Sequence, residues 1–197
     1  MSILLNGTLV LAGCGKMGGA MLEGWLKGGA DAKRIAVHEP KPAPEIETLL
    51  RNHNIRLNPP VASIADAEVV IIAVKPQVMG EVLPGLVPLM QAKPVVLSIA
   101  AGKTIASFES AFGKEASIIR AMPNTPAAIG RGITGMVGNK NVSPAQMALA
   151  EALLLSTGEV LRVANEEAID FVTAVSCLLY TSPSPRDRTR SRMPSSA

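Results

Sequence analysis

The chain has 197 residues and a mass of 20.5 kDa, enough for one domain or at most two small ones. Hydrophobic residues make up 48% and charged residues 18%, which excludes wholesale disorder. Aromatic residues make up only 3%, which argues against a protein that stacks single-stranded bases. The net charge of +3 comes entirely from residues 177–197, which hold four arginines and one aspartate, so residues 1–176 are formally neutral and no nucleic-acid partner is predicted.

Two cysteines, Cys14 and Cys177, are too few for a disulfide framework or a four-cysteine zinc site, so a reduced, cytoplasmic setting is expected. No spacing of histidine, cysteine and carboxylate residues predicts a metal site. The first residues lack the basic and long apolar segments of a signal peptide. The longest apolar run, Val69–Val74, is far shorter than the roughly 20 residues that span a bilayer, so a soluble protein without a membrane partner is expected.

Short β-branched runs alternate with amphipathic segments from residue 8 onward. The strands predicted from this pattern are 8–12, 34–38, 55–57, 68–74, 95–99, 117–121, 132–138 and 159–163. The predicted helices are 16–27, 45–52, 78–90 with a break or kink at Pro84, 105–112, 143–156 and 166–175. Repeated strand–helix units predict an α/β fold, a doubly wound parallel sheet with right-handed crossovers.

Three glycines, Gly13, Gly15 and Gly18, stand between the first predicted strand and the first predicted helix with the spacing G-x-G-x-x-G. In this context the first glycine permits a tight turn, the second lets the backbone approach a pyrophosphate, and the third allows close packing of helix on strand. The N–H groups and dipole of the helix N-terminus favour the phosphate charge. The sequence therefore predicts a Rossmann-type dinucleotide site, against the alternative of a merely structural glycine turn.

Glu39 lies 21 residues after Gly18, at the end of the second predicted strand, where a carboxylate binds the adenosine ribose. Taken alone it favours NAD, because it would repel a 2′-phosphate. Lys41 and Arg34 lie nearby in sequence, and either could counter such a phosphate. The sequence leaves the cofactor preference open, and Glu39 could also be an ordinary solvated strand end.

The thiol of Cys14 lies inside the glycine loop, where a helix N-terminus can lower a thiol pKa. No histidine or second acid lies nearby in sequence to act as its base, so a small side chain beneath a phosphate is the favoured interpretation. Nothing else in the chain indicates nucleophilic catalysis. Hydride transfer is the chemistry that needs the fewest protein side chains, and it is the predicted one.

Three further segments lie at the carboxyl ends of predicted strands, where open parallel sheets bind ligands. They are Ala73–Gln77, Ser98–Gly102 and Arg120–Pro126. With the glycine loop and the later segment Ile169–Ser176, they closely resemble the pyrroline-5-carboxylate reductase family. The resemblance runs from about Thr8 to Ser176. It implies the reduction of 1-pyrroline-5-carboxylate to L-proline, the last step of proline biosynthesis, with NADPH or NADH.

The resemblance also implies which residues bind the cofactor and the substrate. The cofactor-binding residues would be Ala12, Gly13, Cys14, Gly15, Lys16, Met17, Gly18, Glu39, Asn58, Ala73, Val74, Lys75, Pro76, Ile99, Ala100 and Ala101. Asn124 and Thr125 would lie towards the nicotinamide, and Glu166 would approach the substrate. Each of these residues also has a non-functional interpretation. Lys75 could be a solvated lysine at a strand end, Asn124–Thr125 could be a rigid turn, and Glu166 could complement a helix dipole.

The composition changes abruptly at Cys177, where the family continues into a helical dimerisation domain that also builds much of the substrate pocket. We expect residues 1–164 to form the dinucleotide-binding domain and residues 165–176 to begin a truncated helical domain. Residues 177–197, rich in Ser, Thr, Pro and Arg, are expected to be a disordered, non-native tail. The complete protein would be a homo-oligomer whose interface is absent from this chain.

The alternatives come from other classes of protein. The chain could hold a dinucleotide and turn nothing over, or it could resemble a β-hydroxyacid dehydrogenase, although no catalytic lysine on a later helix is visible. A nucleic-acid-binding tail would rest on four arginines alone.

Overall fold

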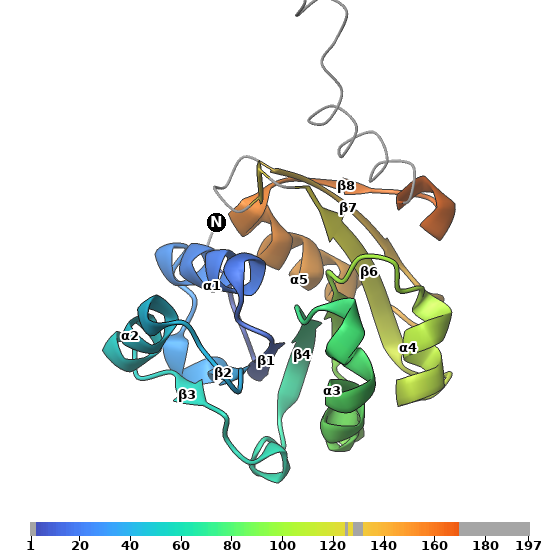
Figure 1. The fold of residues 1–197 in the computed structure, drawn as a ribbon. Coiled ribbons are helices and arrows are strands. Elements are labelled where there is room, and N and C mark those ends of the chain that lie inside the picture. Colours follow the sequence, from blue (N-terminus) through green and yellow to red (C-terminus); the bar gives the residue numbers. More distant parts are fainter. Residues whose placement is uncertain (1–2, 125, 128–131, 170–197) are drawn as a thin grey trace, which may run out of the picture.

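The computed structural model describes residues 3–124, 126–127 and 132–169. Eight strands form one sheet in the order β3-β2-β1-β4-β5-β6-β7-β8 (Figure 1). The strands are β1 (Thr8–Ala12), β2 (Ile35–His38), β3 (Arg56–Leu57), β4 (Ala67–Ile72), β5 (Val95–Ser98), β6 (Ser117–Pro123), β7 (Gly132–Gly138) and β8 (Gly158–Arg162). The α-helices are α1 (Lys16–Lys27), α2 (Pro44–Asn52), α3 (Met79–Leu86), α4 (Ile105–Phe112) and α5 (Pro144–Leu154), and residues 166–169 are also helical.

The sheet is parallel from β3 to β6, and β8 is parallel to β7, as the alternating pattern predicts. The pair β6–β7 is antiparallel, so the prediction of a wholly parallel sheet is wrong at this one pair. Only residues 124–131 separate the two strands. A parallel crossover needs a dozen or more residues, whereas a short connection can only reverse the chain.

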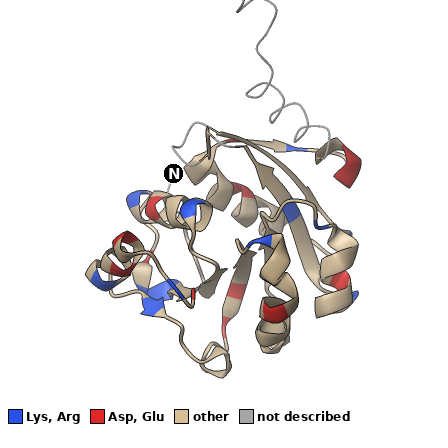
Figure 2. Ribbon diagram, viewed as in Figure 1, with Lys and Arg blue, Asp and Glu red and all other residues tan. Residues whose placement is uncertain are grey.

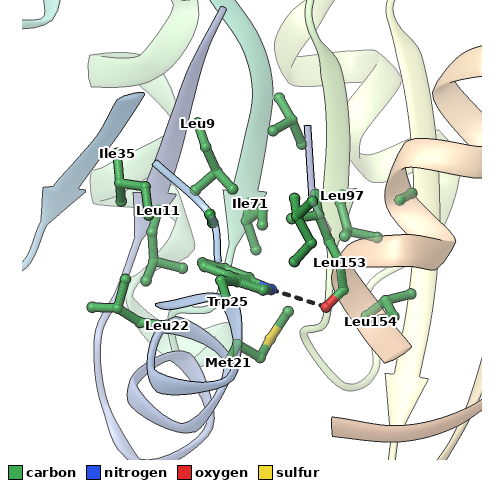
Figure 3. Packing of buried hydrophobic residues seen from close by; sticks show 14 of the residues in the cluster. Leu9, Leu11, Met21, Leu22, Trp25, Ile35, Ile71, Leu97, Leu153 and Leu154 are labelled. Atoms are coloured by element: carbon green, nitrogen blue, oxygen red, sulfur yellow. Dashed lines mark hydrogen bonds between the residues drawn. The ribbon is translucent and has the colours of Figure 1, made fainter. Parts of the chain in front are cut away.

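The two faces of the sheet carry separate hydrophobic layers. One face packs against α1 and α5, and its central side chain is Trp25, fully buried among leucines of the sheet and of α5 (Figure 3). The Trp25 indole Nε1–H donates to the Leu153 carbonyl oxygen at 2.9 Å. The other face packs against α3 and α4, with Phe108 fully buried there. Burial on both faces explains why β4 and β5 are almost uninterrupted apolar runs.

Local signals place most helix ends where the sequence predicts them. The Ser143 hydroxyl accepts from the Gln146 N–H and the Gln146 side chain accepts from the Ser143 N–H, which makes a capping box at the start of α5. Of the predicted break or kink at Pro84, the break is wrong, because Pro84 lies inside α3. The change to 3₁₀ geometry comes at Val87, directly before Pro88, and a proline disfavours helical geometry in the preceding residue.

The strand order reverses between β1 and β4, because β2 lies on one side of β1 and β4 on the other. Open α/β sheets bind ligands in the crevice that such a reversal creates outside the carboxyl ends of the strands. Within the described ranges, no helix is both long and apolar enough to cross a membrane. In the same part of the chain no three His, Cys, Asp or Glu side chains cluster as metal ligands do.

Candidate dinucleotide site

The glycine loop leaves β1 through Gly13, whose backbone is left-handed at φ +91°. The Gly13 N–H donates to the His38 carbonyl oxygen at 2.9 Å, which ties the loop to the end of β2. A Cβ on Gly18 would lie 2.4 Å from the Gly13 carbonyl oxygen, so only glycine lets α1 approach β1 this closely. Both glycines are therefore fixed by the chain's own packing.

Gly15 differs from these two glycines. It precedes the first residue of α1, its backbone is extended at φ −73° and ψ −160°, and a Cβ built on it meets nothing within 4 Å. Neither strain nor crowding therefore demands glycine at this position. The first turn of α1 contains no carboxylate, so the positive end of the helix dipole is not neutralised from within the helix. This open space before a helix N-terminus is the shape that a bound phosphate needs.

Glu39 follows β2 and turns its carboxylate towards the loop. Its Oε2 accepts from the Cys14 N–H at 3.0 Å, and its Oε1 accepts from the Lys41 N–H at 3.1 Å. The backbone of Glu39 is held by the Asn58 side chain, whose Oδ1 accepts from the Glu39 N–H and whose Nδ2 donates to the Glu39 carbonyl oxygen. Asn58 thus braces Glu39, and this role was not predicted from the sequence.

A cavity of about 580 Å³ lies beside the loop, between the start of α1 and the β2–α2 connection. Its lining residues include Cys14, Gly15, Lys16, Gly19, Glu23, Glu39, Lys41, Glu45 and Ile46. Several predicted cofactor residues therefore meet at one cavity. The residue Arg34, considered above as a phosphate partner, lies at the other end of β2, where its Nη1 donates to the Asn6 carbonyl oxygen.

Cys14 is 2% exposed, and burial, followed by the charge of Glu39, raises the pKa of its thiol to about 12. The structure thus supports a small packed side chain at this position and not a nucleophile. Burial also lowers the pKa of His38, which keeps its imidazole neutral at pH 7.

We expect Cys14 to resist alkylation in the folded chain, because a thiol with a pKa near 12 is about one part in 10⁴ thiolate at pH 8. The measurement is iodoacetamide labelling followed by mass spectrometry in a Cys177→Ser variant, which leaves Cys14 as the only cysteine. Labelling should become fast only in denaturant. Fast labelling of the folded chain at pH 8 would contradict the buried, neutral thiol.

The other predicted cofactor segments lie at the same edge of the sheet. The Ala73 N–H donates to the Ala12 carbonyl oxygen, and the Ile99 N–H donates to the Ile72 carbonyl oxygen, so the ends of β1, β4 and β5 are joined. The Ser98 hydroxyl accepts from the Ala100 N–H at 3.2 Å and shapes the next turn. The remaining predicted residues of these segments are partly exposed at Val74 and Pro76 and exposed at Lys75 and Ala101.

The predicted substrate residues that the structure describes, Asn124 and Glu166, lie in different segments, the first after β6 and the second at the start of the last described helix. The Asn124 Oδ1 accepts from the Ile133 N–H at 2.9 Å, which braces the β6–β7 turn, and Thr125 lies outside the described residues. The Glu166 Oε1 accepts from the Ile105 N–H at 2.9 Å and lies 3.2 Å from Nη1 of the buried Arg120. Within the described part of the chain, Asn124 and Glu166 form no hydrogen bond with each other.

Arg120 begins the segment Arg120–Pro126, and no role is predicted for it from the sequence. It is 4% exposed in the middle of β6 and binds Glu166, so it fixes the first helical residue after β8 against the sheet. The signal that could have found it is a charged residue inside the apolar strand of residues 117–121, because a buried charge must be paired.

The chain resembles known oxidoreductases in sequence and in fold. Residues 8–102 match the family described as "NADP oxidoreductase coenzyme F420-dependent". Over 174 residues the chain is 35% identical to the pyrroline-5-carboxylate reductase of Pseudomonas aeruginosa, covering 85% of this chain and 62% of that protein. The corresponding enzyme of a Synechocystis species is 40% identical over 145 residues, which cover 73% of this chain and 53% of that protein.

A solved structure of a pyrroline-5-carboxylate reductase from Coxiella burnetii superposes with a TM-score of 0.81 at 28% identity, covering 90% of this chain and 67% of that one. The chain is related in sequence and fold to the amino-terminal part of the pyrroline-5-carboxylate reductases. Another solved reductase, from Plasmodium falciparum with NADP bound, has a TM-score of 0.74 at 25% identity and covers 89% of this chain and 64% of that one. This chain spans 53–62% of the length of the two curated reductases named above.

Proposed function

We propose that this chain is the dinucleotide-binding part of a pyrroline-5-carboxylate reductase, which reduces 1-pyrroline-5-carboxylate to L-proline with NADPH or NADH. The observation that carries the proposal is the open Gly15 position before α1, in a loop whose other two glycines are fixed by packing. Because a Cβ at Gly15 would meet no protein atom within 4 Å, folding alone does not explain the glycine. The residues present thus fit a pyrophosphate.

The nicotinamide would supply a hydride to the imine carbon, while the imine nitrogen takes up a proton. The chain's own residues bind and orient. The N–H groups of the loop and the first turn of α1 would hold the pyrophosphate, and Glu39 would hold the adenosine ribose. Protonation of the imine is favoured by nearby acceptors, and we assign Asn124, Thr125 and Glu166 to the substrate side of the site.

Glu166 is the residue with the most defined surroundings among these three. Its Oε1 accepts from the Ile105 N–H and from the Arg120 guanidinium, and these two hydrogen bonds hold the carboxylate in a defined place. An ionised carboxylate can stabilise a protonated imine but cannot donate a proton to it. We therefore propose an electrostatic role for Glu166 and not that of a general acid.

We also propose the wider setting of the protein. Residues 1–164 would be the dinucleotide-binding domain, residues 165–176 the start of a helical domain, and residues 177–197 a tail foreign to the fold. The whole protein would be a cytoplasmic homo-oligomer without a nucleic-acid partner, as expected from the family resemblance and from the neutral charge of residues 1–176.

The test is to titrate the 197-residue chain with NADH and NADPH, following the fluorescence of the reduced cofactor, and then to assay turnover. We expect weak binding of at least one dinucleotide and little or no reduction of 1-pyrroline-5-carboxylate, because the family's helical domain contributes to the substrate pocket. Turnover of about 1 per second or more would contradict the expected inactivity of this chain. Absence of binding of either dinucleotide by the folded chain at millimolar concentration would contradict the proposed function itself.

A further inference from the structure

The cavity beside the glycine loop is lined by more acidic than basic side chains. Lys16 and Lys41 line it, together with Glu23, Glu39 and Glu45. Both acidic and basic positions occur on α1 and α2, the two helices that flank the cavity (Figure 2). A 2′-phosphate on the adenosine ribose, added to the pyrophosphate, would therefore lie in a cavity lined by three carboxylates and two ammonium groups.

Glu39 is the carboxylate whose position is fixed. Both of its oxygens accept backbone N–H groups, from Cys14 at 3.0 Å and from Lys41 at 3.1 Å. The Asn58 side chain pairs with both backbone groups of Glu39, at 2.8 and 2.9 Å. A carboxylate held in this way cannot swing out of the cavity without breaking two hydrogen bonds to the loop and its neighbour. The Glu39 carboxylate is therefore held at a fixed position in the lining of the cavity.

The connection from β2 to α2 offers few groups that could neutralise a phosphate. Two of its residues, Pro40 and Pro42, and the first residue of α2, Pro44, have no N–H group, and the Lys41 N–H is already donated to Glu39. The first turn of α2 contains Glu45 and Glu47, which already complement the helix dipole there. The prolines and the Glu39 hydrogen bond thus leave the connection with few N–H donors for an anion, and the N-terminus of α2 is already complemented by its own carboxylates.

Arg34, one of the two basic residues that could counter a 2′-phosphate, does not reach the cavity beside the glycine loop. Arg34 precedes β2, whereas Glu39 follows it, so the two lie at opposite edges of the sheet. The guanidinium of Arg34 is held at its own edge by the Asn6 carbonyl oxygen and the Asp31 carboxylate. Lys41 is left as the basic side chain of the β2–α2 connection that lines the cavity.

We propose that Glu39 makes this site select NADH over NADPH. The inference rests on the proposed function, that the chain binds a reduced nicotinamide dinucleotide. The free 2′-hydroxyl of NADH can donate a hydrogen bond to the Glu39 carboxylate, as ribose hydroxyls do to acids at the end of the second strand. The 2′-phosphate of NADPH has no comparable donor and adds about two negative charges beside Glu39 and Glu45.

The experiment measures direct binding of NADH and NADPH to the 197-residue chain by cofactor fluorescence, with circular dichroism confirming that each variant is folded. We expect NADH to bind at least about tenfold more tightly than NADPH at low salt, since one screened like-charge contact amounts to about this factor. Glu39→Gln keeps the shape and an acceptor oxygen and removes the charge. In this variant the two affinities should come within about threefold, mainly through tighter binding of NADPH. The control Glu115→Gln removes a carboxylate just before β6, at the opposite edge of the sheet, and should leave the ratio unchanged.

The outcomes separate the two proposals. Equal or tighter binding of NADPH by the unaltered chain, or an unchanged ratio in Glu39→Gln, would overturn the role of Glu39 while the proposed function stands. Failure of both cofactors to bind would instead reject the proposed function. Competition with 5′-AMP and with adenosine 2′,5′-bisphosphate locates the effect, because a preference set by Glu39 must appear equally in these fragments, which lack the nicotinamide.

Discussion

Gly15→Val is expected to weaken dinucleotide binding about a hundredfold or more, which is at least about 2.7 kcal/mol, while the chain stays folded. The backbone of Gly15 is extended at φ −73° and ψ −160°, a conformation that valine adopts readily. A Cβ at this position meets no protein atom within 4 Å, so the new side chain occupies open space in front of the loop. That space is where the pyrophosphate would lie. The measurement is the fluorescence titration with NADH and NADPH, together with thermal unfolding.

Gly80→Val is the matched control for this prediction. Gly80 is the second residue of α3, and a Cβ there also meets nothing within 4 Å. The two variants therefore make the same substitution at two uncrowded glycines, only one of which belongs to the loop. Gly80→Val should bind as the unaltered chain does. Unchanged affinity in Gly15→Val would mean that the glycine loop does not hold the pyrophosphate.

Trp25→Ala is expected to lower the free energy of unfolding by about 3–5 kcal/mol, a large share of the roughly 5–15 kcal/mol of a typical domain. Trp25 is fully buried and is the only tryptophan of the chain. Its ring joins α1 to α5 and to the sheet (Figure 3), and no neighbouring side chain could fill its volume without moving a helix. Urea unfolding followed by circular dichroism measures the loss, because the variant has no tryptophan fluorescence.

Trp25→Phe separates packing from hydrogen bonding. Phenylalanine keeps most of the apolar volume and loses the indole N–H that donates to the Leu153 carbonyl oxygen. That oxygen also accepts from the Ser156 hydroxyl at 2.7 Å, so it keeps a partner in the variant. We expect a loss of about 1 kcal/mol from the missing hydrogen bond, plus a smaller cavity cost. Equal losses for Trp25→Phe and Trp25→Ala would show that packing is not the main contribution.

Most of the fold could be predicted because it is encoded locally. The helix α1 spans the predicted residues 16–27, since a glycine loop begins it and a glycine pair follows it. The capping residues Ser143 and Gln146 place the start of α5 in the same way. The antiparallel pair β6–β7 was missed because strand direction depends on the length of the connection, which is too short for a crossover. A break at Pro84, one of the two predicted outcomes there, does not occur, because α3 continues through this residue to Leu86.

The candidate site divides in a similar way. The loop glycines and Glu39 follow the spacing typical of dinucleotide sites, so the sequence alone predicts them as cofactor residues. The partners of Glu39 could not be named, because Asn58 lies 19 residues away and reaches it only when β3 pairs with β2. The ion pair of Arg120 and Glu166 spans 46 residues and depends on how the last described helix meets β6.

The sequence by itself determined the α/β class, the position of the glycine loop between β1 and α1, and the similarity to the pyrroline-5-carboxylate reductases. Each of these depends on the residue types and spacing within short segments of the chain. Only the tertiary structure decided that Gly15 faces open space while Gly13 and Gly18 are fixed by packing. It also decided that Arg34 lies at the edge of the sheet away from Glu39. Both depend on distances between segments remote in sequence, which no local pattern encodes.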